Sequence, residues 1–224
     1  MKPIIFNIEM IKAILDGRKI QDRDTFSKYQ LKVFDYALQL GEINSLDNLH
    51  ENDFSYILQF SKYKVGDILY VREPAKIIGN HKQIGNIYER TCNFKYLADD
   101  KIIENFNIPY RLSASHINQF LYKNMKGTWL TGNKGVPIGC IKEMARIFLK
   151  VTNVRVERLQ DISVRDIEKE SGWRREIYSY SNKNKAFLRD YCDFWNSTAK
   201  DGYRWEDNPY VFVYEFERIE KQWS

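Results

Sequence analysis

The sequence lacks an apolar run long enough to span a bilayer and has few cysteines among its 224 residues. Because no stretch reaches about 18 consecutive apolar residues, we expect no transmembrane helix. The N-terminus, MKPIIFNIEM, has only a short apolar run, broken by Asn7 and Glu9, and no small-residue cleavage site. A secretory signal peptide is therefore not expected. These absences predict a soluble protein of the cytoplasm, with no membrane partner.

Metal-binding and disulfide patterns are also missing. The cysteines are odd in number, far apart and without a CxxC pair, which argues against a disulfide scaffold and against a zinc finger. The histidines are equally scattered. We therefore predict no metal site and no cofactor, and interpret each cysteine as a small buried hydrophobic residue. The residues concerned are Cys92, Cys140, Cys192, His50, His81 and His116.

The chain does have ample material for a packed interior. Hydrophobic residues make up 43% of it and aromatic residues 15%, which excludes a disordered or fibrous protein. With 35 basic and 30 acidic residues, the formal net charge is +5. This excess is compatible with a polyanionic partner but does not require one.

Local patterns in the first third predict a strand, a helix and a helical pair. Residues 3–6 are rich in strand formers, and Asn7 is suited to cap a helix that ends at Gly17. The charged segment 18–24 is predicted to be an exposed turn or an edge strand. Residues 26–60 carry helical periodicity in two halves, which indicates two helices inserted between core strands.

The rest of the chain alternates strand and helix signals without a regular repeat. Ser163, three residues before Asp166, resembles a capping box and opens a helix to about Glu170. The absence of a repeat favours an α+β fold. Further predicted strands cover 68–71, 87–97, 108–112, 146–158 and 210–219, further helices cover 113–125 and 184–199, and a surface loop covers 126–139.

Three sequence blocks occur together in a fixed order: GRKIQDRD at 17–24, VGDILYVRE at 65–73, and RIFLKVTNVRVERLQDIS followed by NPYVFVYEFERI near the C-terminus. Together they resemble ASCH-domain proteins, particularly the longer type carried by bacteriophages and prophages. The resemblance covers residues 1–24, 63–78 and 141–220. It implies a single PUA-like domain over 1–224, a mixed β-barrel with flanking helices, with insertions at about 25–62 and 79–140.

The resemblance implies binding of RNA or of a modified nucleotide. One bacterial branch of the family looks like an amidohydrolase acting on N4-acetylcytidine, with a Lys and a Thr of a G-x-K-x-x-T-x-R segment and a later Glu. By position these fall on Lys19, Asp22 and Glu170, while Asp24 replaces the Arg and Ile20 replaces a Thr that usually follows the Lys. Asp22 offers a carboxylate nucleophile or base in place of the hydroxyl chemistry of Thr.

Candidate ligand-binding residues lie in and beyond the first block. Each has a functional and a structural interpretation. Lys19 is either a phosphate partner or a solvated turn lysine, and Glu170 is either a general acid or base or an exposed helix residue. Arg72 and Glu73 are either ligand contacts or a cross-strand ion pair. The aromatic candidates would stack on bases, and the 173–185 stretch is a candidate nucleic-acid loop or a solvated linker. The full set of binding candidates is Arg18, Lys19, Arg23, Arg72, Glu73, Trp129, Tyr203 and Trp205.

Three functions stay open at this level. The first is a module that binds RNA or a modified nucleotide. The second is an enzyme, an amidohydrolase or a ribonuclease, that uses Lys19, Asp22 and Glu170. The third is a phage protein that binds a host protein such as a defence component through 25–62 and 79–140, because added loops and helices are natural partner surfaces. The oligomeric state is not predicted.

Overall fold

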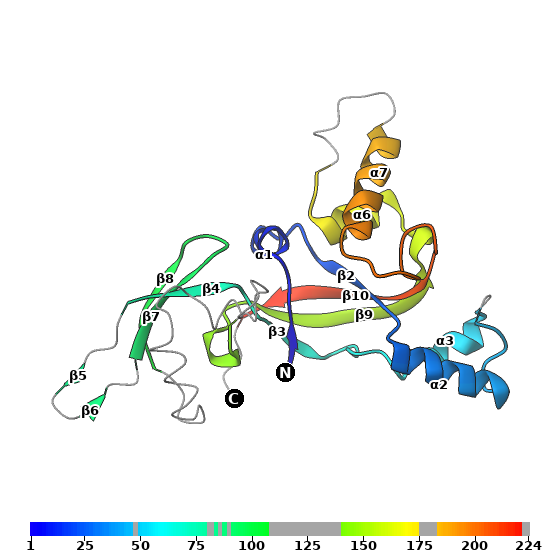
Figure 1. Cartoon of the computed structure of the whole chain (residues 1–224), viewed down its shortest axis with the longest axis horizontal. Coiled ribbons are helices and arrows are strands. Elements are labelled where there is room, and N and C mark those ends of the chain that lie inside the picture. Colours follow the sequence, from blue (N-terminus) through cyan, green and yellow to red (C-terminus); the bar gives the residue numbers. More distant parts are fainter. Residues whose placement is uncertain are drawn as a thin grey trace. The chain divides into compact units, whose positions relative to one another are not determined.

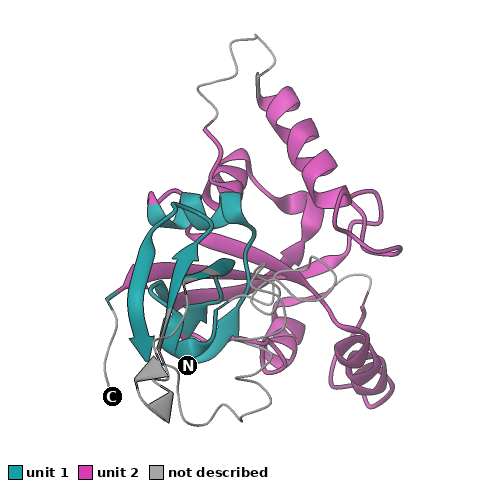
Figure 2. Ribbon diagram, turned by 60° about the vertical axis from the view of Figure 1, so that its left-hand side comes forward, with its two compact units in different colours: residues 1–15, 69–148, 220–224 teal, residues 16–68, 149–219 magenta. Residues whose placement is uncertain are grey.

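The computed structural model describes residues 1–46, 49–79, 83–84, 87–88, 91–107, 140–174 and 183–220. The chain divides into two compact units (Figure 2). Unit 1 consists of Met1–Leu15, Leu69–Phe148 and Glu220–Ser224, and unit 2 consists of Asp16–Ile68 and Leu149–Ile219. The predicted insertion at 25–62 falls in unit 2, and the one at 79–140 falls in unit 1.

Unit 1 combines one helix with short strands. β1 pairs in parallel with β3, where Ile4 lies opposite Val71. β7 lies between β4 and β8 in an antiparallel sheet, and β5 pairs with β6. Its elements are β1 (Lys2–Ile4), α1 (Ile8–Leu15), β3 (Ile68–Val71), β4 (Ala75–Gly79), β5 (Gln83–Ile84), β6 (Ile87–Tyr88), β7 (Thr91–Tyr96) and β8 (Ile102–Asn107), with a 3-10 turn at Lys142–Met144.

The first helix forms as its sequence predicts. Asn7 Oδ1 accepts a hydrogen bond from the Met10 amide at 2.8 Å, which satisfies one of the free amides at the helix start. Ile11 and Ile14 are buried on one face. The chain then turns at Gly17, whose φ of +71° is a left-handed conformation that glycine adopts without a steric penalty.

Unit 2 contains the two longest strands and most of the helices. β9, β10 and β2 lie side by side in that order, and β2 runs antiparallel to β10 with Arg23 opposite Val213. In Figure 1, α6 and α7 lie together beside β2 and β10. The elements are β2 (Gln21–Thr25), α2 (Lys28–Gln39), α3 (Glu51–Leu58), β9 (Phe148–Arg158), α6 (Val164–Ser171), α7 (Lys183–Asn196) and β10 (Tyr210–Ile219), with a 3-10 turn at Leu159–Asp161.

The junction between β2 and α2 is fixed by a cap and by aromatic packing. Ser27 Oγ accepts from the Gln30 amide at 3.2 Å, and Gln30 Oε1 accepts from the Ser27 amide at 2.7 Å, which is a complete capping box. Beside it, the buried Phe26 ring packs against Phe34 and Phe212 with centroids 5.2 and 4.7 Å away. The start of α2 is therefore anchored to β10.

The predicted α+β class is confirmed, but the expected closed barrel is wrong for the described residues. β2 lies at the end of its sheet and pairs with β10 alone among the described strands. A barrel closes only when every strand has two neighbours. The charged sequence of β2 explains the open edge, because edge strands commonly carry charged and inward-pointing charged residues.

Most of the predicted elements are present, and the differences cluster in one region. The strand predicted at 210–219 and the helices predicted in 26–60 and 184–199 are confirmed within a few residues. β4 and β8 were not expected from their sequences. The elements predicted at 108–112, 113–125 and 126–139 lie outside the described residues. In the described part of the chain, no helix is long and apolar enough to cross a membrane.

Asp53 in α3 provides a test of this fold. Its buried carboxylate accepts hydrogen bonds from the Asn44 amide at 3.0 Å and the His50 amide at 2.8 Å. Burial by itself raises the pKa of Asp53, but these hydrogen bonds outweigh it and hold the pKa below its ordinary value. We predict that Asp53→Asn lowers the free energy of unfolding by about 2 kcal/mol at neutral pH.

The pH dependence of that loss follows from the lowered pKa. The stabilisation by the ionised carboxylate is fully present above the ordinary aspartate value of about 3.9 and disappears as the pH falls through the lower pKa of the folded protein. Urea unfolding of wild type and Asp53→Asn between neutral and acidic pH measures this. A stability difference that stays constant down to the lowest pH would contradict the assigned role.

Candidate functional site

Lys19 lies at the centre of a buried polar network in unit 2. Its side chain has 0% exposure, and its ammonium donates to the Gln21 carbonyl at 2.8 Å, the Glu170 carbonyl at 2.7 Å and Asp22 Oδ1 at 2.8 Å. An ammonium has three N–H donors, and three acceptors surround this one. Lys19 is thus a buried cation that ties β2 to α6, and the solvated-turn interpretation of this residue is wrong.

Glu170, predicted to lie near Lys19, is buried and paired on both carboxylate oxygens. Oε2 accepts from Arg23 Nη1, and Oε1 accepts from the Tyr191 hydroxyl at 2.7 Å. Arg23 Nη2 donates in turn to Glu157 on β9. The alternative of an exposed helix glutamate is therefore wrong, and the residue joins α6, β2 and α7.

The protonation behaviour of this network follows from its burial. Burial raises the pKa of Glu170, and the positive charges of Arg23 and Lys19 act in the opposite direction. Burial lowers the pKa of Arg23, but Glu170 and Glu157 outweigh it, so the pKa of Arg23 is raised. Burial also raises the pKa of Tyr191 well above its ordinary value. Tyr191 therefore remains a hydrogen-bond donor to the carboxylate, and Arg23 remains charged.

The network limits what chemistry the predicted catalytic group can do. Lys19, Asp22 and Glu170 do converge, but the side chains of Lys19 and Glu170 are 0% and 5% exposed. Asp22, with 24% exposure, is the one of the three that a dissolved substrate can reach. A phosphate at Lys19 would have to replace one of its three acceptors. The arrangement is suited to holding elements together, with a single accessible carboxylate at its edge.

Arg18, another predicted ligand contact, contacts the C-terminal end of α6. Its Nη1 donates to the Gly172 carbonyl, and its Nη2 lies 2.8 Å from Asp16 Oδ2. Gly172 ends α6 with a φ of +70°. Arg18 therefore binds the C-terminus of α6, and part of its charge is balanced by Asp16.

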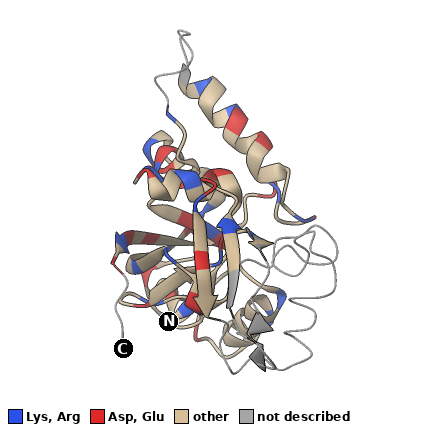
Figure 3. Cartoon of the chain, turned by 90° about the vertical axis from the view of Figure 1, so that its left-hand side faces the viewer, with Lys and Arg blue, Asp and Glu red and all other residues tan. Residues whose placement is uncertain are grey.

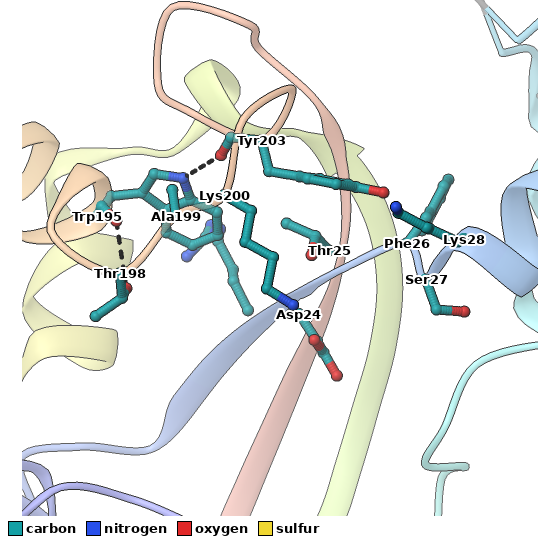
Figure 4. Close-up of a pocket in the computed structure, with 11 residues that line it drawn as sticks. Asp24, Thr25, Phe26, Ser27, Lys28, Trp195, Thr198, Ala199, Lys200 and Tyr203 are labelled. Atoms are coloured by element: carbon teal, nitrogen blue, oxygen red, sulfur yellow. Dashed lines mark hydrogen bonds between the residues drawn. The ribbon is translucent and has the colours of Figure 1, made fainter.

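A cavity of about 400 Å³ lies next to this network within unit 2 (Figure 4). One wall comes from the end of β2 and the start of α2, and the other from the C-terminal end of α7 and the loop that follows. We call it the β2–α7 pocket. It is lined by Arg23, Asp24, Thr25, Phe26, Ser27, Lys28, Trp195, Thr198, Ala199, Lys200 and Tyr203.

Hydrogen bonds hold the α7 side of the pocket in place. The Trp195 indole donates to the Tyr203 carbonyl at 2.8 Å, and the Tyr203 amide donates to the Lys200 carbonyl at 3.0 Å. Figure 4 shows the Tyr203 ring extending from this loop toward Phe26 and Lys28, while the Lys200 side chain points toward Asp24. The pocket thus combines aromatic rings with lysines at its rim.

Sequence reasoning identified part of this pocket. Arg23 and Tyr203, both predicted as ligand contacts, line it. Trp205 is not among the lining residues; its ring packs against Tyr191 with centroids 6.2 Å apart. Trp129 and most of the predicted 173–185 loop lie outside the described residues. Two parts of the wall were missed. One is Thr25–Lys28, where an aromatic, a hydroxyl residue and a lysine directly follow a charged strand. The other is on the α7 side and consists of Trp195, Thr198, Ala199 and Lys200.

Arg72 and Glu73 belong to unit 1, where Glu73 is part of a separate ion-pair cluster. The buried Glu73 carboxylate accepts from Arg146 Nε at 3.1 Å and Nη2 at 2.8 Å, and Arg146 lies over the Tyr96 ring at 3.9 Å. Arg72 Nε donates to the Cys140 carbonyl at 3.3 Å. An ion pair was one predicted role for Glu73, and its partner proves to be Arg146.

Nucleophilic or metal chemistry finds little support elsewhere in the described residues. Cys140 is buried, and burial raises its pKa, which keeps the thiol protonated. Cys192 is only partly buried, and its pKa is raised as well, mainly by burial. Within the described ranges, no group of three or more His, Cys, Asp or Glu residues is arranged to hold a metal ion.

Removing one partner from the network should destabilise unit 2. We predict that Glu170→Gln lowers the free energy of unfolding by about 3 kcal/mol, because the buried Arg23 loses the more deeply buried of its two carboxylate partners. Tyr191→Phe should cost about 1–2 kcal/mol, since one oxygen of Glu170 loses its donor. Glu217→Gln, at a carboxylate that is 57% exposed, is the matched control and should change little. Equal stability of Glu170→Gln and this control in urea unfolding would refute the structural role.

We compared the chain with known proteins. No family model, no curated protein sequence and no solved structure matches the chain.

Proposed function

We propose that this chain binds RNA or a nucleotide in the β2–α7 pocket. The observation that carries the proposal is the convergence of aromatic rings and lysines around one cavity of about 400 Å³. Ligand pockets commonly enclose about 300–1,000 Å³. Proteins that bind single-stranded nucleic acids place aromatic side chains beside cations, because bases stack and phosphates are negative. The β2–α7 pocket has both features.

The positive charge that a phosphate could meet at the pocket comes from its two lysines, Lys28 and Lys200. On α7, Figure 3 shows acidic residues interspersed with basic ones, so this helix does not present a face of one sign. The overall excess of +5 is modest. Lys28 and Lys200 are exposed at the rim, and Lys200 points toward the carboxylate of Asp24 (Figure 4). Lys28 is therefore the stronger phosphate partner of the two.

A relationship to ASCH domains is part of this proposal. It is supported by the contact between Lys19 and α6 at Glu170, the two positions that the family motif pairs. Asp22, Asp24 and Ile20 depart from the motif, and the open edge at β2 departs from the PUA-like barrel that the resemblance implies. An origin in a bacteriophage or prophage rests on the resemblance alone.

Fluorescence anisotropy with a short labelled RNA tests the proposal. We expect the wild-type protein to bind with micromolar or tighter affinity that weakens as the salt concentration rises. Lys28→Gln should depend less on salt, because one phosphate contact is lost. The slope of log K against log salt should then fall in magnitude by about 0.7. Lys200→Gln should have a smaller effect. Lys32→Gln, one turn along α2 and outside the pocket, is the matched control. Flat anisotropy traces for the wild-type protein at low salt would reject the proposed function.

Hydrolysis of N4-acetylcytidine-like nucleosides is a second candidate, favoured by the convergence of Lys19, Asp22 and Glu170. In this arrangement the partly exposed carboxylate of Asp22 is the reacting group, as nucleophile or base, and the ammonium of Lys19 holds it at 2.8 Å. A ribonuclease that used the Asp22 carboxylate would likewise need its RNA substrate to reach that group. Binding of a host protein stays a prediction, since residues 79–140 are described only in part.

Turnover measurements separate this candidate from simple binding. If Asp22 is the reacting group, wild type converts N4-acetylcytidine to cytidine and acetate, or cleaves labelled RNA, and Asp22→Asn falls to the background rate. Glu217→Gln, at an exposed carboxylate outside the network and the pocket, is the control and should retain activity. Absence of turnover by the wild-type protein would discard the enzyme and leave the RNA-binding proposal standing.

A further inference from the structure

Resting on the proposed RNA function, we infer that the β2–α7 pocket takes one unstacked base on the ring of Tyr203, so that the ligand is single-stranded RNA and not a duplex. The aromatic rings around the pocket differ in how they are packed. Trp195 and Trp205 both pack against the buried Tyr191 ring, at centroid distances of 6.5 and 6.2 Å. These tryptophans are partly buried and pack against a buried cluster of unit 2.

Tyr203 differs from these neighbours. It is partly exposed and lines the cavity, and no aromatic ring of the described residues packs against it. Figure 4 shows the ring projecting across the pocket from the loop after α7. Its ring surface is therefore available to a ligand, whereas that of the two tryptophans is largely used within the protein.

The backbone that carries this ring is held in place by its own hydrogen bonds. Gly202 has a φ of +81°, a conformation that glycine adopts freely, and it sets the turn that presents Tyr203. The carbonyl and amide of Tyr203 are both hydrogen-bonded, to Trp195 and to Lys200. A tyrosine on a fixed backbone loses little conformational entropy on binding, which makes it a suitable stacking surface.

The charges around the cavity indicate which part of a nucleotide lies inside. Arg23 is already paired with Glu170 and Glu157, and Asp24 would repel a phosphate that entered the pocket. The remaining polar walls include the hydroxyls of Thr25 and Thr198. An uncharged base fits this interior better than a phosphate does, and the phosphates then lie outside, toward Lys28.

A duplex cannot supply such a base without distortion. Paired bases are stacked inside the helix, and turning one outward costs a few kcal/mol, whereas a single strand presents bases that are already free. A pocket built for one base and its flanking phosphate therefore discriminates by strandedness. Because one ring face accepts any base, the pocket should show little preference among sequences.

The test compares one labelled 12-nucleotide RNA as a single strand and annealed to its complement, by fluorescence anisotropy at fixed salt. We expect the single strand to bind at least about tenfold more tightly. Stacking on one aromatic ring corresponds to about 5- to 150-fold in affinity, so Tyr203→Ala should weaken single-strand binding by that factor. Tyr203→Phe should remain within about twofold of wild type, because the ring is kept.

Controls keep the result interpretable. Tyr29→Ala removes a tyrosine that is 72% exposed on α2 and outside the pocket, and it should have no effect. Tyr203→Leu keeps much of the apolar volume but removes the aromatic ring. It should lose binding as Tyr203→Ala does, which shows that the loss does not come from a loop disturbed by the small alanine side chain. Circular dichroism and thermal melting confirm that each variant is folded.

The outcomes separate this inference from the function on which it rests. Equal binding of single strand and duplex, or single-strand binding that is insensitive to Tyr203→Ala and Tyr203→Leu, would overturn the inference while RNA binding itself stands. Failure of both RNAs to bind the wild-type protein would overturn the proposed function and the inference together.

Discussion

The buried ion pair between Arg23 and Glu170 is the interaction on which the organisation of unit 2 depends. Two charges are removed from water, and the cost of that removal is offset only because each has further partners: Glu157 for the guanidinium, and the Tyr191 hydroxyl for the carboxylate. The pair connects β2 to α6, and the tyrosine adds α7. Lys19 completes the connection by donating to the backbone on either side.

This network also determines where the pocket lies. Arg23 is at once a member of the ion pair and a wall of the cavity, and Trp195 follows Tyr191 by one turn on α7. The strand and the helix that face each other across the pocket are therefore held by the same buried charges. The polar atoms of Lys19, Arg23 and Glu170 are thus mostly occupied within the protein, in contacts that hold the walls of the β2–α7 pocket.

Local features were predictable from sequence because their causes are local. Asn7 and Ser163 cap helices as expected, and the run of strand formers near the C-terminus forms β10. The pairing of Lys19 with Glu170 came from the family resemblance. The burial of Lys19 could not be foreseen, because a lysine is normally solvated and its acceptors here include a backbone carbonyl 151 residues away. The pocket was found only in part, since its walls come from segments about 170 residues apart.

The open edge of β2 has a consequence for the behaviour of the protein at high concentration. An unpaired strand offers its amides and carbonyls to any other chain, and long apolar edges promote polymerisation. Here the edge strand has five residues, of which three are charged, and the side chain of Arg23 points inward to a fixed partner. A second molecule adding antiparallel as an extra strand would bring like charges into register, and α6 already packs against β2, so this edge disfavours polymerisation.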